Sequence, residues 1–296
     1  IARVVDPVQD KLLQAAMKAG RKGPAPPKAI AAWNFTTGLA DANGKLPVTI
    51  KGSAKQTGDG LVLNGQGYAV TAPLPFDLAE KTLEVWVNLE DLNQRGGGAI
   101  TVQDNKGVVF DSIVFGERQP KRWMAGSNGF KRTLSMNGPA EKEAAQRSVH
   151  VAIVYNSDGT IIGYRDGKPY GRPYKMGLQP FSAGDTEVIF GLRHGTGAGN
   201  SRMLAGKVLK AHLYDRALEA SEILASADGN PNYISEKEIL AAMTDFQRKQ
   251  LKGLSTSLEK LNAEMSALQK IGSVSPDPWR DLAQAMFNLK EFIYIQ

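Results

Sequence analysis

The side chains with the most potential for chemistry are concentrated in residues 117–132. This segment combines a tryptophan with charged, amide and hydroxyl groups, namely Glu117, Arg118, Lys121, Arg122, Trp123, Ser127, Asn128, Lys131 and Arg132. An indole ring can stack on the apolar face of a sugar, and arginine forks bind anionic oxygens in a bidentate way. The alternative is structural: Trp123 lies in the core, and Glu117 pairs with an arginine to hold a long loop.

A second candidate is the pair Arg193 and His194, which precedes a glycine-rich run at residues 195–200. Functional residues often lie on such loops. The run is not a phosphate-binding loop, because no Lys-Ser/Thr pair or helix start follows it. The other histidines, His150 and His212, lie in apolar segments, which favours a packing role. No two histidines have the spacing of a zinc-binding motif.

The composition excludes several classes of protein. The 296 residues include no cysteine, so disulfides, iron–sulfur clusters, thiol nucleophiles and covalently attached haem are excluded. The apolar runs are far shorter than the roughly 20 residues that cross a bilayer, and we expect no membrane span. The chain begins with Ile1 and has no signal-peptide pattern, so we expect a processed or excised segment of a longer protein.

The net charge of +6 comes mainly from one end of the chain. Residues 1–29 hold six basic and two acidic side chains, whereas residues 230–296 hold eight of each. A nucleic-acid-binding domain needs a basic footprint across its surface. We therefore expect no nucleic-acid partner and interpret the excess as solvated linker charge.

The middle of the chain has the pattern of an antiparallel β protein. From Trp33 to about Tyr214, short runs of β-branched and aromatic residues alternate with Gly, Asn and Asp turns. Examples are the strand pattern at residues 83–87 and the hairpin pattern at residues 148–170. Many short strands with such turns predict a two-sheet sandwich or a barrel.

Helical patterns flank this region. Apolar residues at helical spacing near the start are followed by a Pro-rich linker at residues 21–27. Near the end a heptad seam, typical of a short coiled coil or helical hairpin, is formed by Leu251, Leu254, Leu258, Leu261, Met265 and Leu268. Residues 279–295 then have the pattern of a final amphipathic helix. We predict three parts: residues 1–29, 30–226 and 227–296.

Several stretches together carry a family resemblance. They are residues 32–35, 60–65, 81–87, 150–155, 164–167, 204–208 and 214–218. In this order they resemble a laminin-G-like member of the concanavalin A-like lectin and glucanase superfamily, which implies a mainly β jelly-roll sandwich with flanking helical segments. The stretches at residues 110–118, 122–128, 279–283 and 287–292 resemble the version found in exported planctomycete proteins that also contain cytochrome c-like and PSD-type domains.

The resemblance also implies a setting and a metal. It implies an exported protein, in the periplasm or at the cell surface, whose haem lies outside this chain because Cys-x-x-Cys-His is absent. Laminin-G-like domains usually bind calcium, for which the oxygen ligands could come from Asp41, Asn43, Asp104, Asn105 and Asp111. No fixed ligand spacing is present, so a turn-forming role is favoured for these residues, and we expect no other cofactor.

The resemblance raises glycosidase activity as well. Retaining enzymes need two carboxylates about 5–5.5 Å apart, and the Glu-x-Asp-x-x-Glu motif of the glucanase branch does not occur. Asp111 and Glu117 are too far apart along the chain for such a pair. We therefore expect a module that is not an enzyme.

Two functional hypotheses follow. The first is a non-catalytic, lectin-like carbohydrate-binding module, for neutral or anionic polysaccharide, whose ligand contacts are Glu117, Arg118, Arg122, Trp123, Asn128, Arg132, Arg193 and His194. The alternative is a structural module that joins other domains or subunits of a cytochrome-associated assembly through its terminal helices. An open groove lined by Trp123, Arg122 and Arg193 would favour binding, whereas their burial in ion pairs would favour the structural role.

Overall fold

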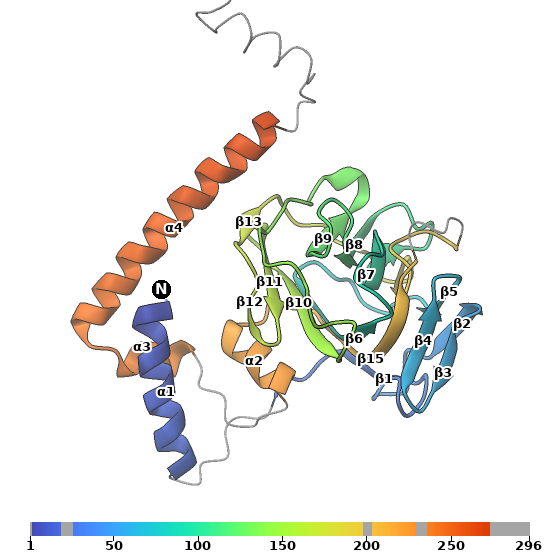
Figure 1. Cartoon of the computed structure of the whole chain (residues 1–296), viewed down its shortest axis with the longest axis horizontal. Helices are drawn as coiled ribbons and strands as arrows, with labels where there is room; N and C mark the ends of the chain where they lie inside the picture. Colours follow the sequence, from blue (N-terminus) through green and yellow to red (C-terminus); the bar gives the residue numbers. More distant parts are fainter. Residues whose placement is uncertain (1, 19–25, 198–202, 229–235, 273–296) are drawn as a thin grey trace, which may run out of the picture.

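The computed structural model describes residues 2–18, 26–197, 203–228 and 236–272. Most of them form two antiparallel β-sheets that face each other, with helices beside them (Figure 1). This arrangement confirms the predicted two-sheet jelly-roll sandwich. The boundaries proposed at residues 29/30 and 226/227 stay a prediction.

The first sheet, sheet A, has nine strands. Its main path runs β12 (Lys168–Pro169), β11 (Thr160–Arg165), β10 (Val149–Tyr155), β6 (Lys81–Leu89), β15 (Ala205–Tyr214), β4 (Gly60–Asn64) and β3 (Lys55–Thr57). Two further strands join this path, β1 (Ala31–Asn34) beside β15 and β13 (Tyr174–Lys175) beside β11. The central strand β6 pairs with β10 and β15, so segments distant in sequence become neighbours.

The second sheet, sheet B, has six strands. Their order is β2 (Val48–Gly52), β5 (Gly67–Thr71), β14 (Thr186–Phe190), β7 (Gly97–Asp104), β8 (Phe110–Phe115) and β9 (Trp123–Ser127). The 3₁₀ turn η1 (Asn128–Phe130) follows β9 directly. Strands β8 and β9 therefore place both ends of the 117–132 segment at one edge of sheet B.

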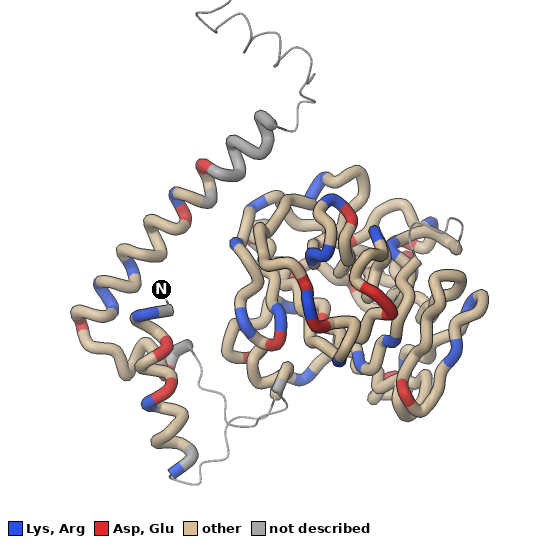
Figure 2. The backbone as a smooth tube through the Cα atoms, viewed as in Figure 1, with Lys and Arg blue, Asp and Glu red and all other residues tan. Residues whose placement is uncertain are grey.

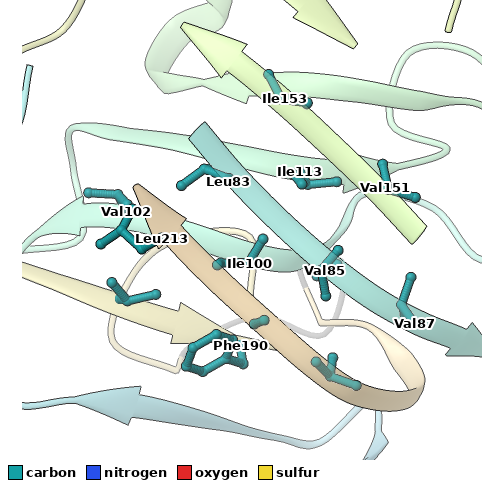
Figure 3. Packing of buried hydrophobic residues seen from close by; sticks show 14 of the residues in the cluster. Leu83, Val85, Val87, Ile100, Val102, Ile113, Val151, Ile153, Phe190 and Leu213 are labelled. Atoms are coloured by element: carbon teal, nitrogen blue, oxygen red, sulfur yellow. The ribbon is translucent and has the colours of Figure 1, made fainter. Parts of the chain in front are cut away.

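The main core lies between the sheets. Alternate residues of β6, Leu83, Val85 and Val87, point into it and are fully buried against residues of sheet B such as Ile100 and Val102 (Figure 3). Each such side chain contributes about 1.5–3 kcal/mol on burial. The period-two pattern of the sequence thus reflects one face of each strand turned toward the opposite sheet.

Strand β10 departs from this alternation because both its faces are covered. All of its residues are buried. Helix α2 (Ala220–Asp228) lies over its outer face, where Leu218 and Ile223 pack against Ala152, Val154 and Tyr214. The chain after β15 thus returns to cover sheet A.

The remaining helices form a small separate core. They are α1 (Ala2–Lys18), α3 (Glu236–Ala242) and α4 (Asp245–Gly272). Val4 and Val8 of α1 pack with Ile239 and Met243, so the N-terminal helix lies against the segment around α3, beside the sandwich (Figure 1). No helix among the described residues is both long and apolar enough to cross a membrane. The predicted helix at residues 279–295 lies outside the described residues.

Residues of both charges are spread along the chain. In the view of Figure 2, Lys and Arg are interspersed with Asp and Glu over the sandwich and the helices. The expectation that nucleic acid is not a partner stays a prediction.

A buried ion cluster connects the two sheets. The Lys81 ammonium at the start of β6 lies 3.0 Å from Asp111 Oδ2 of β8, and neither side chain is exposed. Arg132 Nε donates to Asp111 Oδ1 at 2.9 Å. Burial lowers the pKa of Lys81, an effect that the Asp111 carboxylate opposes. The Lys81 ammonium also donates to the carbonyl oxygens of Ala79 and Gln179.

Replacing Asp111 with Ala should destabilise the fold strongly, because two buried cations would lose their counter-charge. Removing one partner of a buried pair costs about 3–5 kcal/mol. The control is Asp59→Ala, whose ion pair with Lys207 is exposed and should contribute at most about 1 kcal/mol. Chemical denaturation measures both free energies of unfolding, and equal values for the two variants would contradict this role.

Candidate functional site

The 117–132 segment begins just beyond β8, forms β9 and ends after η1. Ion pairs and hydrogen bonds attach it to the sandwich at several points. The positions of its predicted ligand contacts decide which of them can reach a ligand.

Trp123 lies in the core. Its side chain is only 2% exposed, and its ring packs against that of Phe115, its partner on the neighbouring strand β8, with 4.8 Å between centroids. Its Nε1 donates to Glu141 Oε2 at 2.8 Å. The ring is therefore covered by protein and presents no face to a sugar at the surface.

Glu141 is the buried acceptor that holds this region together. It accepts hydrogen bonds from Arg165 Nε and Nη2 at 2.8 and 3.0 Å, in addition to the one from Trp123. Burial alone would raise the pKa of Glu141, but the hydrogen bonds from Arg165 and Trp123 outweigh it and lower the pKa to about 2. The carboxylate is thus ionised near neutral pH and serves as an anchor.

Arg132 and Asn128 also act within the protein. Besides Asp111, the guanidinium of Arg132 donates to the carbonyl of Phe110 and to Asn128 Oδ1, at 3.0 and 3.1 Å. Arg132 is 6% exposed. Its charge is balanced inside the sandwich, so it fixes the turn η1.

Contacts within the protein also engage three further predicted ligand residues, Arg122, Glu117 and Arg193. Arg122 Nε donates to the carbonyl oxygen of Gly138 at 2.8 Å. Arg193 forms an ion pair with Glu117, and both side chains are largely buried. Trp123 is therefore covered, while Arg122 and Arg193 each have a partner within the protein. The geometry gives these side chains structural contacts, and their role as ligand contacts stays a prediction.

His194 is held by a close approach of two loops. Its ring stacks on Phe110 with 4.2 Å between centroids and 11° between planes, and Nδ1 lies 3.0 Å from the carbonyl oxygen of Gly107. Gly107 has a φ of 68°, and a Cβ there would lie 2.3 Å from the Cα of Gly195. Only glycine fits this contact, which positions the imidazole.

Two side chains of the segment remain at the surface beside each other. Phe130 is 45% exposed, and the guanidinium carbon of Arg118 lies 5.1 Å from the centroid of its ring. Phe130 has a φ of 56°, following Gly129 with a φ of 57°. A left-handed backbone is unfavourable for a bulky side chain and often marks a functional position. We refer to Arg118 and Phe130 together as the Arg118–Phe130 platform.

The sequence interpretation included Arg118 but missed Phe130. It considered Trp123 as the stacking ring because the indole stands among arginines. A usable signal was the Asn128-Gly129 pair directly before Phe130, since Asn-Gly pairs favour tight turns that expose the next residue.

A second polar cluster lies on the outer side of sheet A. Glu84 of β6 is fully buried, and its carboxylate is within hydrogen-bond distance of His150, His212, Tyr214 and Ser226. Burial raises the pKa of Glu84, but the histidine hydrogen bonds outweigh it and lower the pKa to about 2. A carboxylate in this state cannot act as a general acid near neutral pH.

The carboxylates named above as possible calcium ligands accept hydrogen bonds from nearby backbone N–H groups or form ion pairs. Asp41 accepts from the backbone N–H groups of Asn43 and Leu46, and Asp104 from those of Val108 and Val109. Asp111 faces Lys81 and Arg132. In the described part of the chain, no three His, Asp or Glu side chains are grouped so as to hold a metal ion.

An open pocket of about 380 Å³ lies apart from the 117–132 segment. Its lining combines the half-buried ring of Phe76 with polar side chains, including Lys28, Asn43 and Lys45. Volume and lining fall within the range of small-ligand sites, so it is a competing location for a ligand.

Comparison with known proteins identifies the family. A laminin G-like family model, described as the concanavalin A-like lectin/glucanases superfamily, matches residues 63–224. The match covers more than half of the chain, and the protein belongs to this superfamily. No curated protein matches it in sequence.

Several solved structures are similar to this chain. Domain 4 of AbnA, an extracellular arabinanase from Geobacillus stearothermophilus in complex with arabinotriose, has a TM-score of 0.50 at 19% identity, covering 68% of this chain and 98% of that one. A Trypanosoma rangeli sialidase bound to 2,3-difluorosialic acid has a TM-score of 0.49 at 16% identity, covering 75% of this chain and 38% of the sialidase.

The receptor-binding domain of botulinum neurotoxin mosaic serotype C/D has a TM-score of 0.43 at 13% identity, covering 68% of this chain and 50% of that domain. The chain therefore spans well under two thirds of the sialidase and toxin structures. At these identities the likeness establishes the fold alone.

The Glu141 anchor should make stability depend on acid pH. Its folded-state pKa of about 2 is below the ordinary 4.5, so its stabilisation is complete above about pH 4.5 and is lost as the pH falls toward 2. Glu141→Gln should therefore lower the free energy of unfolding at pH 7 and flatten its decline between these pH values. Denaturant melts at a series of pH values measure this, with Glu143→Gln, an exposed carboxylate, as the control. Identical slopes for Glu141→Gln and the unmodified protein would contradict the anchor.

Proposed function

We propose that this chain is a non-catalytic carbohydrate-binding module of a larger exported protein, and that the Arg118–Phe130 platform contacts the glycan. The observation that carries the proposal is the exposed ring of Phe130, held outward by a left-handed backbone with a guanidinium against it. An exposed ring offers the apolar surface on which a sugar can stack, which the buried Trp123 does not.

The charges around the platform favour an anionic polysaccharide. Lys121 and Lys131 are exposed on the same segment as Arg118. Within the described residues, none of these three cations takes part in an ion pair with a carboxylate. Guanidinium and ammonium groups bind sulfate or uronate oxygens through charge-assisted hydrogen bonds. A sulfated or uronic-acid glycan therefore suits the platform better than a neutral one.

The state of three buried or largely buried carboxylates supports a binding role without catalysis. Glu117 is paired with Arg193, and Glu141 is ionised and held by Arg165 and Trp123. Glu84 lies buried under α2 with a pKa of about 2. A glycosidase needs one carboxyl that stays protonated to serve as the acid, whereas hydrogen bonds lower the pKa of both Glu84 and Glu141 to about 2.

The fold and the sequence resemblance support the wider setting. The AbnA domain, whose fold is similar, is part of an extracellular enzyme and was solved with arabinotriose. Export to the periplasm or cell surface, and an association with cytochrome c-like domains, are parts of this proposal that rest on the sequence resemblance. A structural role in joining domains is the second candidate, favoured by apolar side chains exposed on α4, such as Leu261.

Native gel electrophoresis in the presence of soluble polysaccharides tests the platform. Sulfated or uronic-acid polysaccharides should retard the protein more than neutral ones. Phe130→Ala should weaken binding about tenfold, equivalent to about 1.4 kcal/mol, because the stacking surface is removed. The matched control is Phe246→Ala, which removes an exposed ring of α4, 75% exposed, and should leave binding unchanged.

Two outcomes would contradict the proposal. Loss of binding in Lys45→Ala but not in Phe130→Ala would move the site to the pocket beside Phe76. An absence of retardation by every polysaccharide tested would exclude the carbohydrate-binding function and favour the structural role.

A further inference from the structure

Lys81 and Asp111 form a contact that is shielded from solvent. Lys81 is the first residue of β6 in sheet A, and Asp111 belongs to β8 in sheet B. The Nζ atom of Lys81 lies 3.0 Å from Oδ2 of Asp111, and both side chains are 0% exposed. No group of the described residues donates a hydrogen bond to Oδ2, so this short approach lacks the alignment of an ordinary hydrogen bond. The fold thus brings a primary amine and a carboxyl group together in its interior.

The surroundings of Lys81 orient its nitrogen. Nζ donates to the carbonyl oxygens of Ala79 and Gln179 at 3.1 and 2.9 Å. The rings of Tyr155 and Phe181 cover it, with centroids 4.8 and 5.0 Å away. Burial lowers the pKa of Lys81, which favours the neutral amine. A neutral amine has two N–H groups, which the two carbonyls can accept, and its lone pair is then left to face the neighbouring carboxyl group.

Arg132 distinguishes the two oxygens of the carboxyl group. Its Nε and Nη2 atoms both lie 2.9 Å from Oδ1 of Asp111, which is the oxygen that does not face Lys81. A charged donor at this position stabilises the negative charge that develops on Oδ1 when a nucleophile attacks the carboxyl carbon. Oδ1 is therefore held as an oxyanion would be, whereas Oδ2 is the oxygen that can leave.

We propose that Lys81 and Asp111 condense to an isopeptide bond that joins the two sheets covalently. The ammonium first passes one proton to Oδ2, which gives a neutral amine and a carboxylic acid. The nitrogen lone pair then attacks Cγ of Asp111, and an electron pair of the C=O bond moves to Oδ1. A second proton passes from the nitrogen to Oδ2. The Cγ–Oδ2 bond breaks, one water molecule leaves, and the carbonyl group forms again.

The site favours this reaction in two ways. Isolated charges are costly in a protein interior, and the condensation removes one buried cation and one buried anion together, so the net charge beside Arg132 does not change. Groups held in reacting positions also behave as if present at about 10⁵ M or more. The chain has no cysteine, so an amide provides a cross-link that disulfides cannot. The inference does not depend on the proposed carbohydrate function.

Mass spectrometry of the purified full chain tests the bond. Most molecules should be lighter than the sequence mass by one water molecule. Trypsin does not cleave after an acylated lysine, so the digest should contain residues 56–95 joined to residues 107–118 as a branched peptide. Lys81→Arg keeps the positive charge but lacks the amine, and it should have the full mass and unlinked peptides. The matched control in the same digest is the exposed pair of Lys207 and Asp59, also 3.0 Å apart, which should stay unlinked.

Two outcomes would overturn the proposal. The full sequence mass, with tryptic cleavage after Lys81, would show that the pair remains an ion pair. Loss of one water molecule without a link between the two peptides would place the loss elsewhere, for example in a succinimide. Both readouts use the unmodified chain, so neither requires Lys81→Arg to fold.

Discussion

The buried carboxylate of Asp111 is the constraint on which much of this structure depends. It belongs to sheet B, yet its two cationic partners come from the first residue of β6 in sheet A and from the turn after β9. An ion in the interior of a protein is tolerated only when it is paired and hydrogen-bonded. The sandwich therefore has to bring Lys81, Asp111 and Arg132 together, which fixes the two sheets relative to each other at this edge.

Arg132 connects this buried ion cluster to the turn at the surface. Because its guanidinium is held by Asp111, Asn128 and the carbonyl of Phe110, the short turn η1 has little freedom. Gly129 and Phe130 then adopt left-handed backbone angles, and the Phe130 ring points outward beside Arg118. The buried charges thus determine which side chains of the 117–132 segment stay available to a partner. The position of the Arg118–Phe130 platform therefore depends on the buried ion pairs.

The sequence predicted the architecture better than the site. Alternation in strands such as β6 and the intervening turns were sufficient for the sandwich, because period two is a local property. The contacts of Trp123, Arg193 and Arg132 are not local: their partners Glu141, Glu117 and Asp111 lie 18, 76 and 21 residues away. Spacing along the chain cannot reveal such pairs, and a cluster of arginines looks the same whether it faces a ligand or its own carboxylates. His150 and His212 likewise converge on Glu84 only after three strands pair.

The central claim is that the buried ion pairs hold the 117–132 segment so that Phe130 and Arg118 can contact an anionic glycan. Nuclear magnetic resonance tests this claim most directly. The isotope-labelled full chain would be titrated with a sulfated or uronic-acid oligosaccharide while its backbone amide signals are followed. The account predicts saturable shifts for residues 117–121 and 128–132. Shifts confined to the pocket around Lys45 and Phe76, or none at high ligand concentration, would contradict it.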